Sequence, residues 1–248
     1  MAINAQGEVG RIRLFNDFFG AGSIANTEDT QSLQPFYVGG EGNEDADTGV
    51  AVLDGLSGVV RMTGGNTDAD TTFIGTPLAF DIALMAPLVA EVRVQMPDVD
   101  TKELFFGITS ILTLDEQLED IIINASATAV TVVADCAGFY FSDELTASAT
   151  TWHAFHGGGT TADSATAATA TLSGSTVTAG EWQVLRLEVD PNGTARWYVD
   201  GDLKKTVEGA VSTTSDVAVC LATGANTTEL VVVDVDYMLV KANRDWNA

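Results

Sequence analysis

The sequence predicts an all-β fold in which two antiparallel sheets pack as a sandwich. Hydrophobic and polar residues alternate over many short segments, and a period of two is typical of strands with one buried face. Clusters of Gly, Asp, Asn, Thr and Pro separate these segments, as turns do in sandwiches and barrels. The sequence lacks the repeated helical segments of about 10–15 residues that a parallel sheet would require.

Three segments show the alternation most clearly: LVAEVRVQM at 88–96, WQVLRLEV at 182–189 and TELVVVDVDYMLV at 228–240. In the last of these, one apolar face is expected to comprise Val231, Val233, Val235, Tyr237 and Leu239. Further strands are expected at 11–19, 35–39, 50–53, 57–63, 71–74, 78–84, 103–109, 121–125, 129–134, 137–142, 151–155, 168–172, 195–200, 203–207 and 216–222. Only 110–122 has helical character, so at most one short helix is expected there.

The chain of 248 residues is expected to form one sandwich domain over 11–248, preceded by a flexible N-terminal arm at 1–10. The N-terminus lacks the hydrophobic core of a signal peptide, which predicts folding in a cytoplasm. The longest apolar run, IALMAPLVA, is shorter than the roughly 20 residues of a membrane-spanning helix. Cys136 and Cys220 are interpreted as buried thiols, and a disulfide between them is the alternative.

The chain is strongly acidic, with 35 Asp and Glu against 11 Lys and Arg and a net charge of −24. Nucleic-acid binding requires a cationic face, and docking to an anionic membrane does too, so the charge excludes both partners. It favours solubility at high local concentration or a saline habitat, and a basic partner surface is the alternative.

The clearest stretch of the sequence is EWQVLRLEVDPNGTARWYVDGDLKKTV at 181–207, a predicted three-stranded meander. Asn192–Gly193 and Asp200–Gly201 suit tight turns because they tolerate positive φ. Trp197 and Val199 are expected to face the core, with Arg196 and Tyr198 on the opposite side.

This meander resembles the late strands of concanavalin A-like and laminin-G-like jelly rolls, of the kind found in phage virion surface proteins. LFNDFFG at 14–20, ELFFGITS at 103–110 and VVVDVDYMLVKA at 231–242 resemble the opening, Phe-Gly and closing strands of that family. The resemblance covers nearly the whole chain in order. It implies a two-sheet jelly-roll sandwich whose first strand, 11–19, lies beside its last, 230–240.

Two aspartates near the C-terminus are candidates for catalysis. Asp234 and Asp236 share one strand face and lie roughly 6.5–7 Å apart along it, near the carboxyl separation of inverting glycosidases. Hydrolases of the resembling family carry a Glu-x-Asp-x-x-Glu strand in mid-chain, which this sequence lacks. The expected role is structural, in which the two aspartates either face solvent or are offset by Arg186 and Arg196 across the sheet, and no residue is assigned to catalysis.

Two Gly-rich loops at 39–49 and 64–72 share a Gly-Gly…Asp-Ala-Asp-Thr pattern. Their candidate Ca²⁺ ligands are Asp45, Asp47, Asp68 and Asp70, although neither loop matches an EF-hand and two solvated acidic loops are the alternative. His153 and His156 would face opposite sides of a strand and lack zinc-site spacing, so no cofactor is expected.

Among the tryptophans, Trp246 and Trp152 are the possible contact residues, while Trp182 and Trp197 are expected to pack in the core. The sequence therefore predicts a non-enzymatic virion structural protein, either a phage capsid decoration protein or another virion surface protein made in the host cytoplasm. Its expected partners are the major capsid protein and further copies of the chain, with a trimer favoured. A lectin-like carbohydrate-binding module that touches host glycans and a glycoside hydrolase or lyase are the alternatives.

Overall fold

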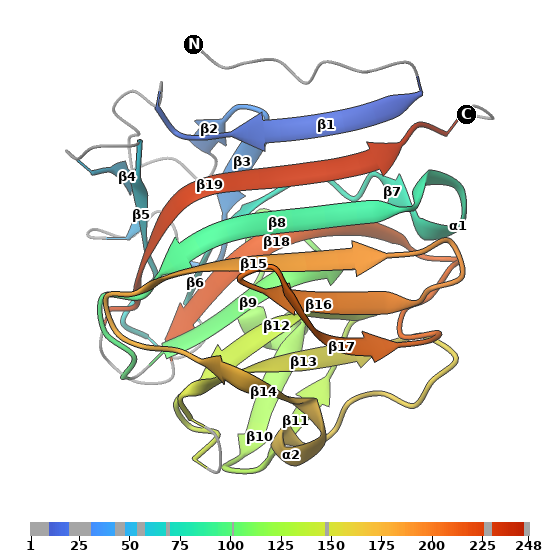
Figure 1. Cartoon of the computed structure of the whole chain (residues 1–248). Helices are drawn as coiled ribbons and strands as arrows, with labels where there is room; N and C mark the ends of the chain where they lie inside the picture. The colour runs from blue at the N-terminus through green and yellow to red at the C-terminus, as the bar shows by residue number, and fades with distance from the viewer. Residues whose placement is uncertain are drawn as a thin grey trace.

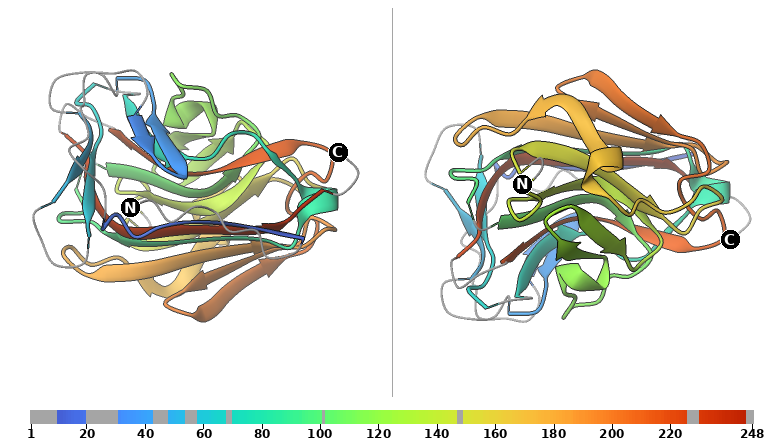
Figure 2. Two further views of the ribbon diagram at one scale, coloured as in Figure 1. Left: turned by 90° about the horizontal axis from the view of Figure 1, so that it is seen from above. Right: turned by 90° about the horizontal axis from the view of Figure 1, so that it is seen from below.

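Two antiparallel β-sheets pack face to face in the computed structural model of this chain, as Figures 1 and 2 show. The structure describes residues 10–19, 31–42, 48–53, 58–67, 70–100, 102–146, 149–225 and 230–245. The predicted all-β sandwich is therefore confirmed. Most of the arm at 1–10 lies outside the described residues.

The first sheet has eight strands in the order β17-β16-β15-β8-β19-β5-β4, with β1 beside the second half of β19. Its strands are β1 (Arg11–Asn16), β4 (Gly49–Val52), β5 (Val60–Thr63), β8 (Leu88–Gln95), β15 (Trp182–Val189), β16 (Ala195–Val199), β17 (Asp202–Val207) and β19 (Val232–Asn243). The first and last strands lie side by side, as the sequence predicted. Leu14 is paired with Val240.

The second sheet has nine strands in the order β14-β13-β12-β9-β18-β6-β3-β2, with β7 beside β18. Its strands are β2 (Gln31–Leu33), β3 (Phe36–Gly39), β6 (Thr71–Gly75), β7 (Phe80–Asp81), β9 (Lys102–Thr109), β12 (Cys136–Ser142), β13 (Thr151–Gly157), β14 (Thr171–Thr176) and β18 (Asp216–Ala225). A separate hairpin joins β10 (Ile122–Ser126) to β11 (Ala129–Val132).

The predicted meander forms as expected. β15, β16 and β17 pair in sequence, and Asp200 and Gly201 take φ values of 51° and 86° in the turn between the last two. Positive φ at both central residues is the signature of a tight hairpin turn whose twist matches that of the strands. Trp197 and Val199 are buried and Tyr198 lies on the opposite face.

Two predicted strands are partly helical. In the predicted strand 78–84, only Phe80–Asp81 pairs with β18, and α1 (Ile82–Met85) follows because the Asp81 side chain accepts a hydrogen bond from the Leu84 N–H and caps the turn. In the predicted strand 168–172, α2 (Ala167–Ala170) comes first and β14 begins only at Thr171. The expected short helix within 110–122 is the single 3₁₀ turn η1 (Leu118–Asp120). None of the helices among the described residues is long and apolar enough to cross a membrane.

The main hydrophobic core lies between the two sheets. Alternate residues of the facing strands fill it, including Val92 of β8, Phe106 of β9 and Trp197 of β16. The Trp197 indole N–H donates to the Gly138 carbonyl at 2.9 Å, which links the eight-stranded sheet to the nine-stranded one. The core therefore fixes which side chains of each strand face outward.

A second hydrophobic cluster covers the outer side of the nine-stranded sheet. Phe105, Tyr140 and Cys220 belong to it, together with Ile122 and Val130 of the β10–β11 hairpin. Both cysteines are free and buried, as the sequence suggested, and burial raises the pKa of each thiol. The hairpin, η1 and α2 contribute residues to this cluster, so much of this outer face is itself buried.

Candidate binding face

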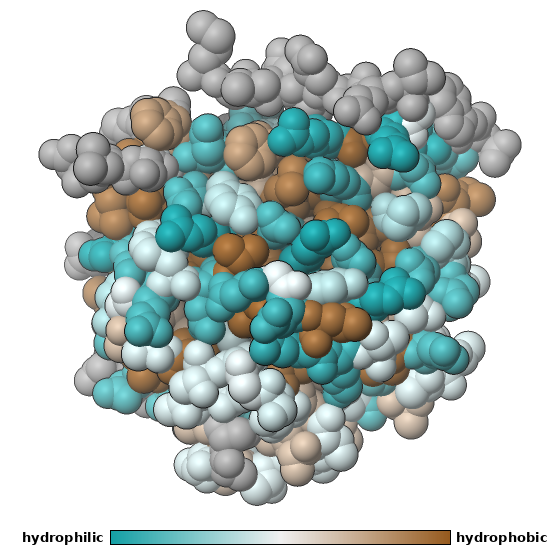
Figure 3. All heavy atoms as spheres, viewed as in Figure 1, coloured by the Kyte–Doolittle hydropathy of each residue, from teal (hydrophilic) through white to brown (hydrophobic). Residues whose placement is uncertain are grey.

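The outer face of the eight-stranded sheet is the candidate functional surface. In the view of Figures 1 and 3 this sheet faces the reader, and polar and apolar side chains are interleaved over it. We call this surface the arginine face. It is defined by the residues Arg61, Arg93, Arg186, Arg196, Trp182, Tyr198 and Tyr237.

Strand register arranges these side chains in rows across the sheet. One row runs from Tyr198 through Arg186 and Glu91 to Leu239, because these residues are direct cross-strand neighbours. Direct neighbours on one face have Cβ atoms roughly 4.5–5.5 Å apart, so the rows form a continuous surface.

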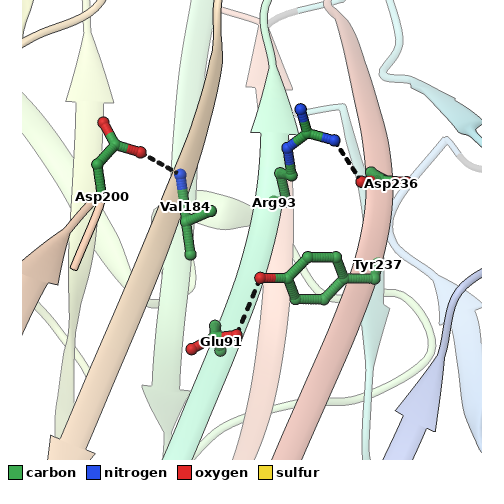
Figure 4. Close-up of polar contacts among 6 residues, drawn as sticks. All are labelled: Glu91, Arg93, Val184, Asp200, Asp236 and Tyr237. Atoms are coloured by element: carbon green, nitrogen blue, oxygen red, sulfur yellow. Dashed lines mark hydrogen bonds and ion pairs between the residues drawn. The ribbon is translucent and has the colours of Figure 1, made fainter.

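Arg93 is held from two sides near the middle of the face. Its Nη1 donates to the Asp236 Oδ2 at 2.5 Å, and its guanidinium carbon lies 4.7 Å from the centroid of the Trp182 ring. Figure 4 shows Arg93 extending from β8 toward Asp236 of β19, and the Tyr237 ring reaching from β19 to Glu91 on β8. The Tyr237 hydroxyl donates to the Glu91 Oε1 at 2.9 Å. Burial, followed by the contact with Glu91, raises the pKa of Tyr237.

The other arginines of this face are also bound by carboxylates, Arg196 by the Asp190 Oδ2 at 2.6 Å. Arg61 makes a two-pronged contact with Asp234, Nε to Oδ1 at 2.7 Å and Nη2 to Oδ2 at 2.9 Å, and this hydrogen bonding raises the pKa of Arg61. Arg186 donates to Glu188 and lies over the Tyr198 ring. The face therefore carries planar cations whose orientations are fixed by carboxylates and aromatic rings.

The apolar face predicted for the last strand is wrong beyond Val235, because β19 contains a β-bulge. Val235 pairs with Val94 but Tyr237 pairs with Arg93, so Asp236 is an extra residue in β19. The alternation shifts there, as bulges require, and Met238 and Val240 face the core instead of Tyr237 and Leu239. The bulge therefore places Tyr237 on the arginine face.

The two aspartates that are candidates for catalysis are both ion-paired. Asp234 pairs with Arg61 and Asp236 with Arg93, whereas both were expected either to face solvent or to be offset by Arg186 and Arg196. Those two arginines lie on β15 and β16, whereas the direct neighbours of the aspartates come from β5 and β8. Sequence cannot give this strand order.

Trp152 is not a surface contact residue. Its side chain is fully buried, its indole N–H donates to the Gln183 Oε1 at 2.9 Å, and its ring packs against Phe139 and Phe141. Trp246, the other possible contact residue, lies outside the described residues. Sequence reasoning missed Trp182, which was expected in the core. Its even number places it with Arg186 and Glu188 on the outward side of β15, and that parity was the available signal.

Three of the four candidate Ca²⁺ ligands, Asp45, Asp47 and Asp68, lie outside the described residues. Asp70 lies where the two Gly-rich loops meet, since a Cβ on Gly65 would lie 2.1 Å from its Oδ2 and a Cβ on Gly42 would lie 2.9 Å from its Cγ. Within the described part of the chain, no three His, Cys, Asp or Glu side chains group as metal ligands do.

The two histidines face opposite sides of β13, as predicted. His153 stacks on Phe155 and His156 lies near Trp197 in the main core. Burial lowers the pKa of His153 to about 4 and lowers that of His156 as well, so both are neutral near pH 7.

One buried carboxylate lies under the second hydrophobic cluster. Glu103 of β9 is only 7% exposed, and it accepts a hydrogen bond from the Ser142 hydroxyl at 3.4 Å. Desolvation raises the pKa of Glu103 to about 7, and the nearby Glu144 charge adds to the rise while Tyr140 and Ser142 oppose it. A carboxyl group with this pKa suits proton transfer, but Glu103 is buried, and the Ser142 hydroxyl that contacts it accepts a hydrogen bond from the Asn124 amide of β10 at 3.2 Å.

No protein-family model matches the sequence, and no curated protein matches it. Solved structures do resemble the fold. A protein of unknown function from Shewanella oneidensis MR-1 has a TM-score of 0.60 at 14% identity, over 98% of this chain and 91% of that one. The carbohydrate recognition domain of Emp46p, in its potassium-bound form, has a TM-score of 0.55 at 10% identity, over 91% and 97%.

An endo-β-1,4-glucuronan lyase from the fungus Trichoderma reesei has a TM-score of 0.51 at 11% identity, over 94% of each chain. The neighbours thus include both a sugar-recognition domain and a glycan-cleaving enzyme, and at these identities they establish the fold alone. Together with the sheet order and the paired first and last strands, they show that this chain adopts the concanavalin A-like jelly-roll sandwich.

Proposed function

We propose that this domain binds glycans through the arginine face and does not cleave them. The observation that carries the proposal is the fixed geometry of Arg93, whose guanidinium is held by Asp236 on one side and by the Trp182 ring on another. Groups that are already ordered before a ligand arrives lose little conformational entropy on binding.

The chemistry of the face suits sugar hydroxyls, which both donate and accept hydrogen bonds. Arginine has five N–H donors, and within the described residues Arg93 makes its one hydrogen bond through Nη1. Glu91 and the Tyr237 hydroxyl lie beside it on the same face and add acceptors. The partly exposed rings of Trp182 and Tyr198 supply apolar area between these polar groups.

The absence of cleavage is proposed from the state of the carboxylates on this face. A retaining or inverting glycosidase needs one carboxyl group that donates a proton and a second that acts as nucleophile or base. Asp234 and Asp236 are each bound to an arginine, so neither carboxylate is free to act on a glycosidic bond. Neighbouring folds include a lyase as well as lectin-type domains, so a direct assay of cleavage is part of the test.

Trp182→Ala is expected to weaken glycan binding by about tenfold or more, because it removes the ring that orders Arg93. A glycan array would identify a ligand for the unmodified domain, and calorimetry would then compare the variants. Phe19→Ala is the matched control, because Phe19 is 74% exposed but lies outside the arginine face. The proposal fails if the array shows no glycan bound, or if both variants bind equally well. Release of shortened products from the ligand would refute the claim that the domain does not cleave.

Assembly of a virion surface is the second candidate function, with the major capsid protein or another copy of the chain as partner. Its support is the composition of the arginine face, since Trp, Tyr and Arg are enriched at the centres of protein–protein interfaces. This role predicts an oligomer, for which a trimer is favoured, that Trp182→Ala dissociates. Sedimentation at high protein concentration tests it, and a strictly monomeric domain would count against it.

A further inference from the structure

Basic residues are concentrated on the outer side of the eight-stranded sheet, which contains the arginine face, although the chain as a whole is acidic. Seven of the 11 basic residues alternate with core-facing residues in the strands of this sheet and so point outward from it. They are Arg11, Arg13, Arg61, Arg93, Arg186, Arg196 and Lys241. Five acidic residues share the face: Glu91, Glu188, Asp234 and Asp236 of these strands, and Asp190, which directly follows β15 and pairs with Arg196. The face thus has an excess of positive charge in a chain of net charge −24.

The opposite sheet has the reverse balance. In its described strands Lys102 is the one Lys or Arg, and its ammonium is paired with Asp98. The covering segment from η1 to the hairpin carries Glu119 and Asp120 without a basic residue. Among the described strands, positive charge is therefore concentrated on one side of the sandwich.

The depth of the charges decides which sign the arginine face presents to a ligand. The side chains of Arg61 and Asp234 are 39% and 6% exposed, those of Arg93 and Asp236 are 37% and 15%, and those of Arg186 and Glu188 are 43% and 20%. In these three pairs the carboxylate lies deeper and the guanidinium lies at the surface, whereas Arg196 and its partner Asp190 are about equally exposed, at 30% and 33%. A ligand that approaches from solvent meets the cations first.

The geometry points to a carboxylate-bearing glycan, a chain of uronate sugars, as the ligand of the arginine face. The fork of a guanidinium binds a planar carboxylate through two parallel hydrogen bonds, and Arg61 already binds Asp234 in that way on this face. This inference rests on the proposed function and adds the ligand's charge to it. The arginines must attract the uronate carboxylates at short range, because the acidic residues elsewhere in the chain repel a polyanion. Salt screens this repulsion at longer distances.

The test compares a uronate oligosaccharide with the same oligosaccharide after reduction of its carboxyl groups to alcohols. Calorimetry at about 0.15 M salt, where the screening length is about 8 Å, limits repulsion by distant acidic residues. The uronate form is expected to bind about tenfold to a hundredfold more tightly, as hydrogen bonds to charged groups imply. The double variant Arg93→Gln with Arg186→Gln is expected to abolish that difference. The control Arg244→Gln, which removes one positive charge at an exposed residue beyond β19, is expected to keep it, and each single variant, Arg93→Gln or Arg186→Gln, is expected to reduce it at the same change in net charge.

The contrary results of this experiment can be told apart. Equal binding of both oligosaccharides overturns the uronate inference and leaves glycan binding in place, whereas binding of neither overturns the proposed function as well. Tighter binding of a sulfated oligosaccharide of the same length would show that the forks do not select a planar carboxylate. Loss of the difference in Arg244→Gln would show that net charge, rather than the arginine face, determines binding.

Discussion

Replacing Trp197 with alanine is expected to lower the free energy of unfolding by about 3–5 kcal/mol, which is the usual cost of removing a large buried ring. The side chain is fully buried between the sheets, and its N–H bond to the Gly138 carbonyl is one of the direct links between them. The substitution opens a cavity and leaves that carbonyl without the indole donor. Chemical denaturation would measure the effect as a lower midpoint with an unchanged slope.

Trp182→Ala is the matched comparison, because it removes the same side chain from the opposite face of the neighbouring strand. Its ring is partly exposed and contacts Arg93, so the expected loss of stability is about 1 kcal/mol or less. Equal losses from the two substitutions would contradict the assignment of one tryptophan to the core and the other to the arginine face.

Replacing Glu103 with glutamine is expected to stabilise the protein at pH 8 by roughly 3 kcal/mol and to have little effect near pH 4. Burial raises the pKa of Glu103 to about 7 from its ordinary value of 4.5. Below pH 4.5 the carboxyl group is protonated in both the folded and the unfolded chain. As the pH rises from 4.5 to 7, the unfolded chain loses this proton first, so the native protein loses stability, and glutamine removes that loss.

The measurement is the difference in unfolding free energy between Glu103→Gln and the parent protein as a function of pH. Titrating groups that do not interact with Glu103, such as the buried histidines, contribute equally to both proteins and cancel in this difference. Glu208→Gln is the control, since Glu208 is exposed and is not among the groups that shift the pKa of Glu103, so a pH-dependent gain of this size is not expected there. A difference that does not change between pH 4 and pH 8 would show that Glu103 is not held in a desolvated site.

Alternation of apolar and polar residues predicts the strands well where one face is buried. It predicts them less well where a helix cap or a β-bulge determines the local conformation. Alternation predicted Trp197 in the core, the family resemblance predicted the first strand beside the last, and both are found. Alternation missed the helix α1 because Ile82–Met85 is apolar throughout and has no period of its own; the Asp81 cap decides its conformation. It missed the bulge at Asp236 because one inserted residue leaves no local signal.

The candidate site depends on contacts between distant parts of the chain. The pair Arg61 and Asp234 is separated by 173 residues, so only the order of strands in the sheet brings it together. The burial of Glu103 likewise depends on the β10–β11 hairpin, which covers a strand whose sequence alone does not show that both of its faces are buried. The alternation of β15 could have predicted that Trp182 faces outward, whereas its contact with Arg93 could not be predicted from the sequence.

The most direct test of the central claim, that ligands bind on the arginine face, is hydroxyl-radical footprinting with and without the uronate oligosaccharide. The partly exposed rings of Trp182, Tyr198 and Tyr237 report on this face, and the exposed Phe19, which is not part of the arginine face, is the reference. Binding at the arginine face predicts that the ligand lowers oxidation of the first three residues and leaves Phe19 unchanged. Unchanged oxidation of Trp182, Tyr198 and Tyr237 under saturating ligand would contradict it.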